Sequence, residues 1–431
     1  MTGSLIEQSA LPHADSAQWQ SLLKAFAVAG SSNAANAVPG APDWWRSQAA
    51  AKARQISQSG LPTTRLEDWK YTNLVQLHAR DRKIALGPVD VRGPDGLQVL
   101  TLSQMERVAS VDLNLISRVR KSLSKETGGF TGRLCRALVA DPFVICVPEG
   151  LKSAEPIEIT WKALPDGFWS MGAVVIDVGA RSSVSIVERY GREVDAQSLL
   201  TLVNVGAGAR VTHLRSQQGP GKADVGVVTA AAHIDVFEGA NYHGLQVSSG
   251  SCLSREDLEV ELLYAGAKAT VDGVYIGKGK QVLDHHTSLC HRVGETLSEQ
   301  LYKGILCDES RGVFNGRIAI AKNARGSNSS QMNRNLLLSK KVEIDTKPQL
   351  EIDNDDVKAA HGAAIGRLDA EHIFYLQSRG IGKAQAIEIL ACGFAFDVLD
   401  RIEDLAETHK LRELAKVCIS DSLVGLTWGD A

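Results

Sequence analysis

Apolar residues recur at helical spacing near the start of the chain. Four of them in the segment Asp43–Ser59 fall on one helix face: Trp45, Ala49, Ala53 and Ile56. Pro42 precedes this segment and Gly60 follows it, which are ordinary start and stop signals. A shorter helix is expected at 16–28. The first part of the chain, residues 1–80, is therefore predicted to be a helical domain, and residues 81–154 form a mixed region without a clear period.

The pattern changes near residue 155. Ile157, Ile159 and Trp161 alternate with Glu158 and Thr160, as in a half-buried strand. Short apolar or alternating runs then recur at 174–176, 184–187, 199–205, 225–232, 258–263 and 269–276. Helix signals are almost absent from this region, so residues 155–366 are predicted to be mainly β.

The strand region also repeats. Glycines mark five similar turns, at Gly179, Gly208, Gly239, Gly266 and Gly294, spaced 29, 31, 27 and 28 residues apart. A steady period of this length is typical of solenoids, in which each coil stacks its strands on the previous one. We expect a β-solenoid. An ordinary β-sandwich with coincidental turns is the alternative.

Helical patterns return after His361. Asp369 is a good N-cap for a first helix that ends at Arg379 and Gly380, and further helices are expected at 383–402 and 403–418. Residues 367–431 are thus predicted to form a C-terminal helical domain. A chain of 431 residues is long enough for such a division.

Composition excludes several classes of protein. The formal net charge of −3 argues against binding nucleic acid through bulk charge. No apolar run is long enough to span a bilayer, and the N-terminus lacks a signal-peptide core, so we expect a cytoplasmic protein without a membrane segment. The seven cysteines form no CxxC pair, and most are expected to be small buried apolar residues.

The densest cluster of candidate ligands is the run from Asp284 to His291, with three histidines, a cysteine and an aspartate. In a strand, alternate residues face opposite sides, so Asp284, His286 and Cys290 separate from His285 and His291. Neither face matches a closed zinc pattern. The sequence favours a structural role for this run.

The remaining metal-binding, nucleotide-binding and catalytic motifs do not match this sequence. The acidic run Asp353–Asp356 lacks the glycine and glutamate of a calcium loop and is expected to be a solvated edge. No phosphate-binding glycine loop, nucleophile elbow or HExxH helix occurs in the sequence. The chain is therefore predicted to have no nucleotide site of its own.

His361 remains as the candidate metal ligand. It follows a long acidic strand-like stretch, lies where the predicted solenoid gives way to helices, and is followed by small residues that leave it accessible. The two residues before it, Ala359 and Ala360, offer no ligand atoms.

Several ordered segments resemble the SufB/SufD family of the SUF iron–sulfur cluster assembly machinery. They are Arg65-Leu66-Glu67-Asp68-Trp69-Lys70-Tyr71-Thr72, Asp284-His285-His286-Thr287, Arg311-Gly312-Val313-Phe314-Asn315-Gly316-Arg317, Asn335-Leu336-Leu337-Leu338-Ser339, the stretch 345–352, Asp355-Asp356-Val357-Lys358, His361-Gly362-Ala363 and Phe374-Tyr375-Leu376-Gln377-Ser378-Arg379-Gly380-Ile381. The N-terminal cysteine motifs of SufB-type chains are missing, which favours the SufD branch.

The resemblance implies a right-handed parallel β-helix core flanked by N-terminal and C-terminal α-helical domains. It implies a non-catalytic scaffold that pairs with SufB through the β-helix, docks the SufC ATPase on the C-terminal helices and takes part in iron acquisition. Iron or a nascent iron–sulfur cluster would be shared transiently with SufB, reduced flavin has been linked to the complex, and the isolated chain could form a homodimer. His361 matches a family histidine proposed as a ligand at the SufB interface. Ala359 and Ala360 stand where the family usually has Cys-Ser.

Two other hypotheses stay open at this point. One is a SufB-like scaffold paralogue. The other is a β-helix enzyme acting on polysaccharide, for which Asp284, Glu309 and Arg311 are the candidate groups. An aromatic content of 5% leaves few rings to stack on sugars.

Overall fold

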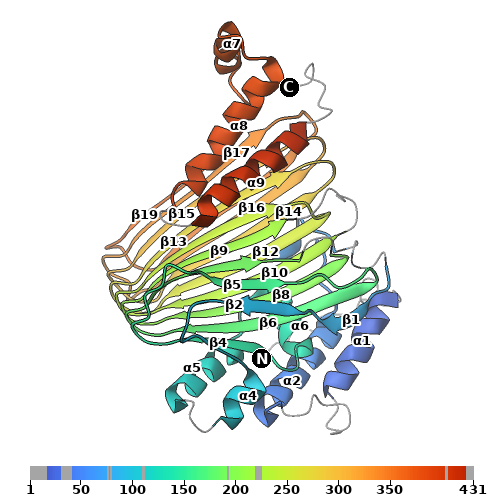
Figure 1. Cartoon of the computed structure of the whole chain (residues 1–431), viewed down its shortest axis with the longest axis vertical. Coiled ribbons are helices and arrows are strands. Elements are labelled where there is room, and N and C mark those ends of the chain that lie inside the picture. The colour runs from blue at the N-terminus through green and yellow to red at the C-terminus, as the bar shows by residue number, and fades with distance from the viewer. Residues whose placement is uncertain are drawn as a thin grey trace, which may run out of the picture.

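The chain folds into a parallel β-solenoid with helices at both ends, as the computed structural model shows for residues 17–30, 41–74, 77, 80–108, 112–191, 194–218, 226–402 and 406–423 (Figure 1). From β4 onward, successive strands alternate between two sheets, so each strand pairs with the strand two places further along the chain. All pairings among β4–β19 are parallel, whereas β2 and β3 pair antiparallel with β5 and β4. The predicted solenoid is confirmed, and the sandwich is wrong.

The strands have the following bounds. The first sheet contains β1 (Lys83–Leu86), β3 (Gln98–Thr101), β4 (Phe143–Val147), β6 (Phe168–Val178), β8 (Ala196–Val205), β10 (Val227–Val236), β12 (Leu253–Leu262), β14 (Val282–His291), β16 (Arg311–Ile320) and β18 (Glu343–Ile352). The second contains β2 (Val89–Arg92), β5 (Ile157–Trp161), β7 (Ser183–Arg189), β9 (Arg210–Gln218), β11 (Asn241–Ser249), β13 (Lys268–Gly277), β15 (Leu297–Leu306), β17 (Asn328–Leu337) and β19 (Lys358–Gly366).

The helices pack at the two ends and on the outer faces of the sheets. They are α1 (Ala17–Gly30), α2 (Asp43–Ser59), the 3₁₀ helix η1 (Glu67–Trp69), α4 (Leu102–Arg107), α5 (Leu113–Ser124), α6 (Gly129–Leu138), α7 (Ala370–Ser378), α8 (Lys383–Leu399) and α9 (Ala406–Leu423). The bounds predicted for α2 agree with the structure, and Asp369 caps α7 by accepting a hydrogen bond from the Glu371 amide. The predicted mixed region 81–154 supplies β1–β4 and α4–α6. Among the described residues, no helix is long and apolar enough to cross a membrane.

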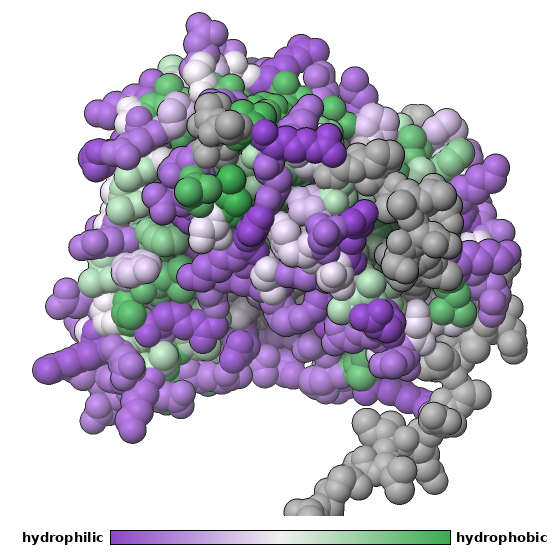
Figure 2. All heavy atoms as spheres, turned by 90° about the horizontal axis from the view of Figure 1, so that it is seen from below, coloured by the Kyte–Doolittle hydropathy of each residue, from purple (hydrophilic) through white to green (hydrophobic). Residues whose placement is uncertain are grey.

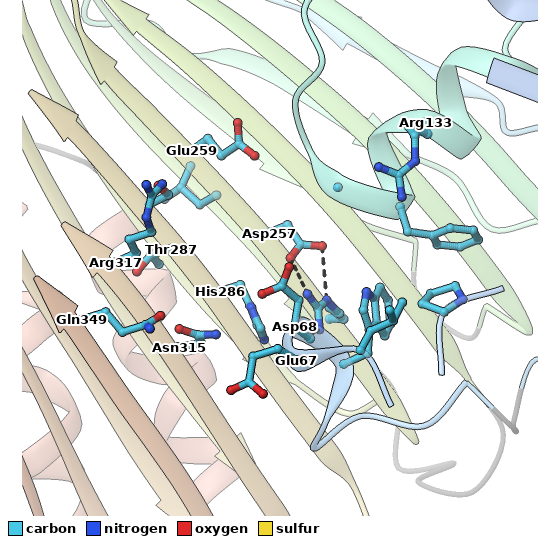
Figure 3. Close-up of a pocket in the computed structure, with 18 residues that line it drawn as sticks. Glu67, Asp68, Arg133, Asp257, Glu259, His286, Thr287, Asn315, Arg317 and Gln349 are labelled. Carbon is cyan, nitrogen blue, oxygen red and sulfur yellow. Dashed lines mark hydrogen bonds and ion pairs between the residues drawn. The ribbon is translucent and has the colours of Figure 1, made fainter. Parts of the chain in front are cut away.

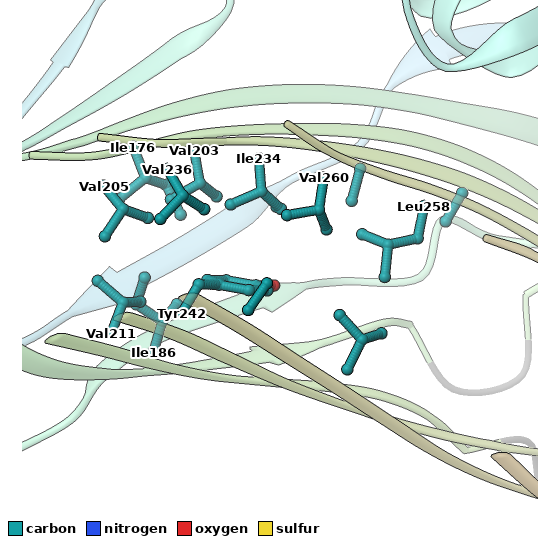
Figure 4. Packing of buried hydrophobic residues seen from close by; sticks show 14 of the residues in the cluster. Ile176, Ile186, Val203, Val205, Val211, Ile234, Val236, Tyr242, Leu258 and Val260 are labelled. Atoms are coloured by element: carbon teal, nitrogen blue, oxygen red, sulfur yellow. The ribbon is translucent and has the colours of Figure 1, made fainter. Parts of the chain in front are cut away.

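The interior of the solenoid is a continuous apolar core between the two sheets. Figure 4 shows Ile176, Val203 and Ile234 of the first sheet facing Ile186 and Val211 of the second. Side chains two residues apart in a strand share a face, so every second position of each coil points inward. Because coil stacks on coil in register, each inward position forms a column that runs along the solenoid.

The outer face of the first sheet changes from apolar to charged towards the late coils. The outer face of the first sheet is covered by α5 and α6 in the early coils, and β10 is buried on both faces. One outward column runs Trp169, Ala196, Val227, Leu253 and Val282, and then ends in Arg311 and Glu343. The outer face of the second sheet is covered by α8 and α9. The late coils of the first sheet therefore present a charged surface.

Left-handed residues close the predicted turns. Gly208, Gly239 and Gly266 have φ of +65°, +59° and +74°, a region where a side chain costs energy. At the first and fifth turns, however, the left-handed residues are Arg181 and Glu295, both with φ of +58°.

The glycines predicted at those two turns serve a different purpose. A Cβ on Gly179 would lie 2.5 Å from the Glu149 nitrogen, and one on Gly294 would lie 2.4 Å from the Arg325 oxygen. These two glycines allow one coil to approach the next closely rather than allowing a positive φ.

The two ends of the solenoid differ. The N-terminal end is covered by α1, α2, α4 and α5 and is mostly hydrophilic, with separate hydrophobic groups (Figure 2). At the other end, β18 and β19 form the last coil. Within the described residues each has a single strand neighbour, β16 and β17 respectively. The solenoid therefore ends in two unpaired strand edges.

Candidate functional site

The open last coil exposes the interior of the solenoid. No side chain of β18 or β19 is fully buried. Ile352 and Ile365 are 43% and 49% exposed, although both are large apolar residues. Long strands with free edges and apolar side chains are ready to pair with another chain.

His361 lies at an inward position of this coil. Ala359, two residues earlier on β19, packs against the interior core, so His361 shares that face. Its register partner on β17 is Gln331, whose own partner on β15 is Gln300. Since no further coil stacks on β19, the imidazole is exposed at the mouth of the interior.

The side chains beneath His361 are polar. The Gln331 amide donates a hydrogen bond to Gln300 Oε1 at 2.6 Å, and the Thr287 hydroxyl donates to the same oxygen from the opposite sheet at 3.2 Å. The Oε1 atom of Gln331 and the hydroxyl of Thr346 are buried without a hydrogen-bond partner. The mouth of the interior is thus a polar surface with unused hydrogen-bonding capacity.

His361 does not form a complete metal site with the rest of the described chain. A group of at least three His, Cys, Asp or Glu ligand atoms within 4.8 Å of one another occurs once in the described residues, and His361 is not part of it. Ala359 and Ala360 supply no ligand. An ion held by His361 would need further ligands from a second chain.

The histidine-rich strand β14 has the two faces expected from the sequence. On the inner face, His291 is bound by hydroxyls, with Nδ1 2.7 Å from Thr296 Oγ1 and Nε2 2.8 Å from Ser298 Oγ. Burial lowers the pKa of His291 to about 4 and that of His285 to about 3. Neither ring is arranged as a metal ligand, which agrees with the structural role predicted.

The outer face of β14 holds an aspartate–histidine pair. His286 Nε2 lies 3.0 Å from Asp284 Oδ1, and the other oxygen of Asp284 accepts hydrogen bonds from Arg255 at 2.9 Å and Thr72 at 2.5 Å. Burial opposes ionisation of Asp284, but the neighbouring His286 and Arg255 outweigh it and hold the pKa well below its usual range. Asp284 is therefore a buried anion at neutral pH.

His286 of this pair lines a cleft of about 420 Å³ between the charged face of the first sheet and the N-terminal segment (Figure 3). His286, Asn315, Arg317 and Gln349 line it from successive coils, and Glu67 and Asp68 line it from the η1 region. The sequence did not predict this cleft, because it joins segments more than 180 residues apart.

A second group of ligand-type side chains was also missed. His233, Asp235 and Glu261 lie on the outer face of β10 and β12 with ligand atoms within 4.8 Å of one another. The Lys125 ammonium lies among them, 2.7 Å from Asp235 Oδ2, 3.1 Å from Glu261 Oε2 and 3.2 Å from His233 Nε2. A lysine cation from the end of α5 thus fills the position that a metal would take.

The cysteines are mostly buried, as predicted. Five are buried and two, Cys252 and Cys418, are intermediate. Burial raises the pKa of Cys135 and Cys307 to about 12 and that of Cys146 and Cys392 to about 11. These four thiols are protonated at neutral pH, so they are poor metal ligands.

The acidic run 353–356 forms the turn between β18 and β19. Its aspartates are exposed, Asp356 pairs with Arg325 at 2.6 Å, and the Asn354 amide donates to the Lys322 carbonyl. This arrangement agrees with a solvated edge.

The groups suggested for a polysaccharide enzyme do not form an acid–base pair. Asp284 is buried and bound as described above. Glu309 pairs with Lys341 at 2.7 Å and Arg311 with Asp345 at 2.7 Å. Neither Glu309 nor Arg311 lines the cleft beside His286.

Comparison with known proteins identifies the family. Residues 163–394, more than half of the chain, match the family model described as "SUF system FeS cluster assembly, SufBD core domain". The chain belongs to the SufBD family. This match supports a role in iron–sulfur cluster assembly.

Individual SufBD-family proteins are similar over most of the chain. An iron–sulfur cluster assembly SufBD family protein of Synechocystis is 28% identical over 402 residues, which cover 84% of this chain and 87% of the relative. The iron–sulfur cluster assembly protein SufD of Escherichia coli is 28% identical over 396 residues, covering 86% and 92% respectively. SufD of Bacillus subtilis is 28% identical over 278 residues, covering 62% and 61%.

The SufBD core match runs from just before β6 into α8. It includes the segments of the resemblance from Asp284 to Ile381 and therefore the open last coil with His361. The segment 65–72 lies outside the match. It docks on the core through Trp69, which stacks on Arg255 of β12, and through Thr72, which binds Asp284 of β14.

The C-terminal helices of this SufBD-family chain extend beyond the solenoid. Figure 1 shows α7 and part of α8 projecting past the last coil. Phe374 and Tyr375 on α7 are 72% and 58% exposed, and α7 has no buried residue. A hollow of about 730 Å³ lies between α8 and α9, lined by Ile389, Cys392 and Phe396 together with charged residues. These helices offer apolar surface away from the body of the molecule.

Proposed function

We propose that this chain is a non-catalytic scaffold subunit of a cytoplasmic SUF complex, on which an iron–sulfur cluster is assembled together with a SufB-type partner. Membership of the SufBD family and similarity to proteins named SufD support the proposal. The observation that carries it is the exposed imidazole of His361 at the mouth of an unpaired last coil.

The partner would pair along the free edges of β18 and β19. β18 has ten residues and β19 has nine. Each is long enough for a partner strand to add to its sheet through main-chain hydrogen bonds. The exposed Ile352 and Ile365 would be buried by such pairing, which adds hydrophobic stabilisation. The same contact would bring a second set of side chains over His361.

His361 would then supply an imidazole nitrogen to iron or to a nascent cluster. Neutral imidazole is an ordinary ligand for iron, and soft thiolates favour clusters. The residues before His361 are alanines, which have no ligand atoms, so the thiolate ligands would come from the partner. The cluster would be cargo that this chain shares transiently, without a cofactor of its own; reduced flavin would belong to the complex.

The second partner would be a SufC-type ATPase. The projecting α7 and α8, with Phe374 and Tyr375 exposed, form the surface that would dock it. Helical segments with exposed aromatic residues are common protein-binding surfaces. Energy from ATP would thus enter at the helices, next to the coil that carries His361.

Reconstitution of the complex tests the role of His361. His361→Ala is expected to lower the yield of assembled cluster, followed by visible absorption, while the complex still elutes as one species. His361→Cys is expected to restore part of the yield, because a thiolate can replace the imidazole as a ligand. His243→Gln, which changes a half-buried histidine of β11 that lies 3.0 Å from Asp272, is the control and should leave the cluster yield unchanged.

Unchanged cluster yield in the His361→Ala complex would overturn the ligand role. Loss of the complex itself in His361→Ala would show that His361 acts in pairing and not as a ligand.

A further inference from the structure

The interior of the solenoid contains a group of buried polar atoms without hydrogen-bond partners. They belong to four inward-facing side chains: Arg215, Gln246, Glu256 and His285. The unpaired atoms are Nε and Nη1 of Arg215, Oε1 of Gln246, both carboxyl oxygens of Glu256 and both ring nitrogens of His285. Each of the four residues is at most 2% exposed.

These side chains are neighbours. Arg215 of β9 and Gln246 of β11 are register partners in one sheet, and Glu256 of β12 and His285 of β14 are register partners in the other. Across the interior, Arg215 Nη1 and Glu256 Oε2 form a long ion pair at 3.7 Å, which is beyond hydrogen-bond distance.

Apolar rings separate this group from the open end. The His285 ring lies 4.9 Å from Tyr275 and 5.6 Å from Tyr302, and Tyr302 lies 5.2 Å from Phe314. Phe314, the register partner of His285 in the next coil, is fully buried. The four polar residues therefore lie in a closed part of the interior and not at the mouth beside His361.

A neighbouring group of buried polar side chains, around Glu188, does have hydrogen-bond partners. Glu188 accepts hydrogen bonds from Trp161 and Thr201, both at 2.8 Å. Its second oxygen lies 3.2 Å from His213 Nε2, and Tyr242 lies 3.2 Å from His213 Nδ1. Buried polar groups in folded proteins are normally paired. The gathering of unpaired atoms on four adjacent side chains therefore points to a ligand between them.

We propose that Arg215, Gln246, Glu256 and His285 enclose a bound-water site in the closed interior of the solenoid. An unpaired buried polar atom costs about 1–3 kcal/mol, so direct burial of all these atoms would be expensive. Buried waters commonly make about three hydrogen bonds to such groups.

The chemistry of the four side chains selects water over an ion. Arg215 offers donors, Gln246 Oε1 offers an acceptor, and neutral His285 offers one of each. An anion would leave the acceptors unpaired and face Glu188 and Glu256. A cation would leave the donors unpaired and face the Arg215 guanidinium. Water donates and accepts, so it can satisfy both kinds of group.

Protonation of Glu256 is consistent with this site. Burial raises the pKa of Glu256 to about 8, even though the nearby Arg215 opposes the shift. A protonated carboxyl has one donor and one acceptor, which matches water in the same way as the other lining groups.

A crystal structure of the full chain that resolves ordered solvent tests the site directly. We expect water within hydrogen-bond distance of Arg215 Nε or Nη1 and of Glu256. Crystals soaked in bromide and in rubidium should show no anomalous peak there. A direct hydrogen bond between Arg215 and Glu256 with no water between them, or an ion peak, would overturn the proposal.

Oxygen-17 relaxation dispersion, which counts long-lived internal waters, gives an independent measurement in solution. Glu256→Leu is expected to lose at least one such water, whereas Glu256→Gln, which keeps a donor and an acceptor, should retain it. Gln246→Leu serves the same purpose if Glu256→Leu does not fold. An unchanged count in the leucine variant that folds would contradict the site.

Discussion

The guanidinium carbon of Arg255 lies 3.8 Å from the centre of the Trp69 ring. Arg255 also binds the Asp68 carbonyl at 2.6 Å and the Asp284 carboxylate at 2.9 Å. One buried side chain of β12 therefore connects the N-terminal segment with the aspartate–histidine pair of β14. The segment 65–72 is held on the solenoid by this contact.

Loss of the Trp69 ring should loosen the N-terminal segment. Trp69→Ala removes a buried indole and its stacking on Arg255, and we expect it to lower the free energy of unfolding by about 3–5 kcal/mol. Urea denaturation followed by circular dichroism measures the change. Trp44→Ala, at a partly buried tryptophan of α2, is the comparison and should cost less. Equal losses for the two variants would argue against a special role of the Trp69–Arg255 contact.

Acid should destabilise the fold through His291. Its pKa of about 4 in the folded protein lies below the ordinary value of about 6.5, so the unfolded chain binds the proton more readily. The contribution of neutral His291 to the free energy of unfolding is therefore complete above pH 6.5. It is lost as the pH falls towards 4. His291→Gln should reduce the dependence of unfolding free energy on pH in this window, measured from urea midpoints. An identical pH dependence in wild type and variant would contradict the assignment.

Lys125 should stabilise the contact between α5 and the first sheet. Lys125→Met leaves Asp235 and Glu261 without the cation between them, and breaking such a partly buried pair should cost about 2 kcal/mol. Thermal unfolding measures the loss. Lys280→Met removes an exposed lysine at 3.8 Å from Glu309 and is expected to have almost no effect. A neutral result for Lys125→Met would show that the carboxylates find other partners.

Lys303 should hold α8 on the second sheet. Its ammonium binds the Phe394 carbonyl at 3.0 Å and Asp397 at 2.5 Å, and it lies 4.5 Å from the Phe394 ring. Lys303→Met should raise amide hydrogen exchange in α8 and α9 while exchange in β10 and β12 stays unchanged. Exchange that rises equally in all four elements would indicate global destabilisation instead.

An aspartate on the open edge should weaken pairing. Ile365→Asp introduces a charge that would be buried by a partner strand, and we expect at least a tenfold loss of affinity for a SufB-type subunit, measured by titration calorimetry. Val99→Asp changes a valine of similar exposure near the opposite end of the solenoid and is the control. Equal affinity of the two variants would place the interface elsewhere.

Much of the fold follows from local signals in the sequence. The helix at Asp43–Ser59 and the cap at Asp369 agree with the structure, because periodicity and capping depend on neighbouring residues. The repeated turns predicted the solenoid, because stacked coils need one tight turn per coil. The alternation along β14 correctly separated its histidines onto two faces.

Long-range contacts limited what could be predicted of the sites. Lys125 forms ion pairs with Asp235 and Glu261, which are more than 100 residues away in the sequence. No local sequence pattern predicts these contacts. Arg215 and Glu256 are charged residues of the strand region, and no local pattern shows that both are buried in the interior. The glycine pattern marked the turns but not which residue in each turn is left-handed, and at two of them that residue is Arg181 or Glu295. The candidate role of His361 stays a prediction.

The stacking of coils gives the molecule a gradient of stiffness. Each coil contacts mainly the coils before and after it, so its resistance to local opening depends on having two neighbours. The early coils have both neighbours and are clamped by helices on the outside. The last coil has one neighbouring coil, and the side chains beneath His361 are polar. Thermal fluctuations should therefore be largest around His361. The last coil can change conformation there while the other coils of the solenoid stay in place.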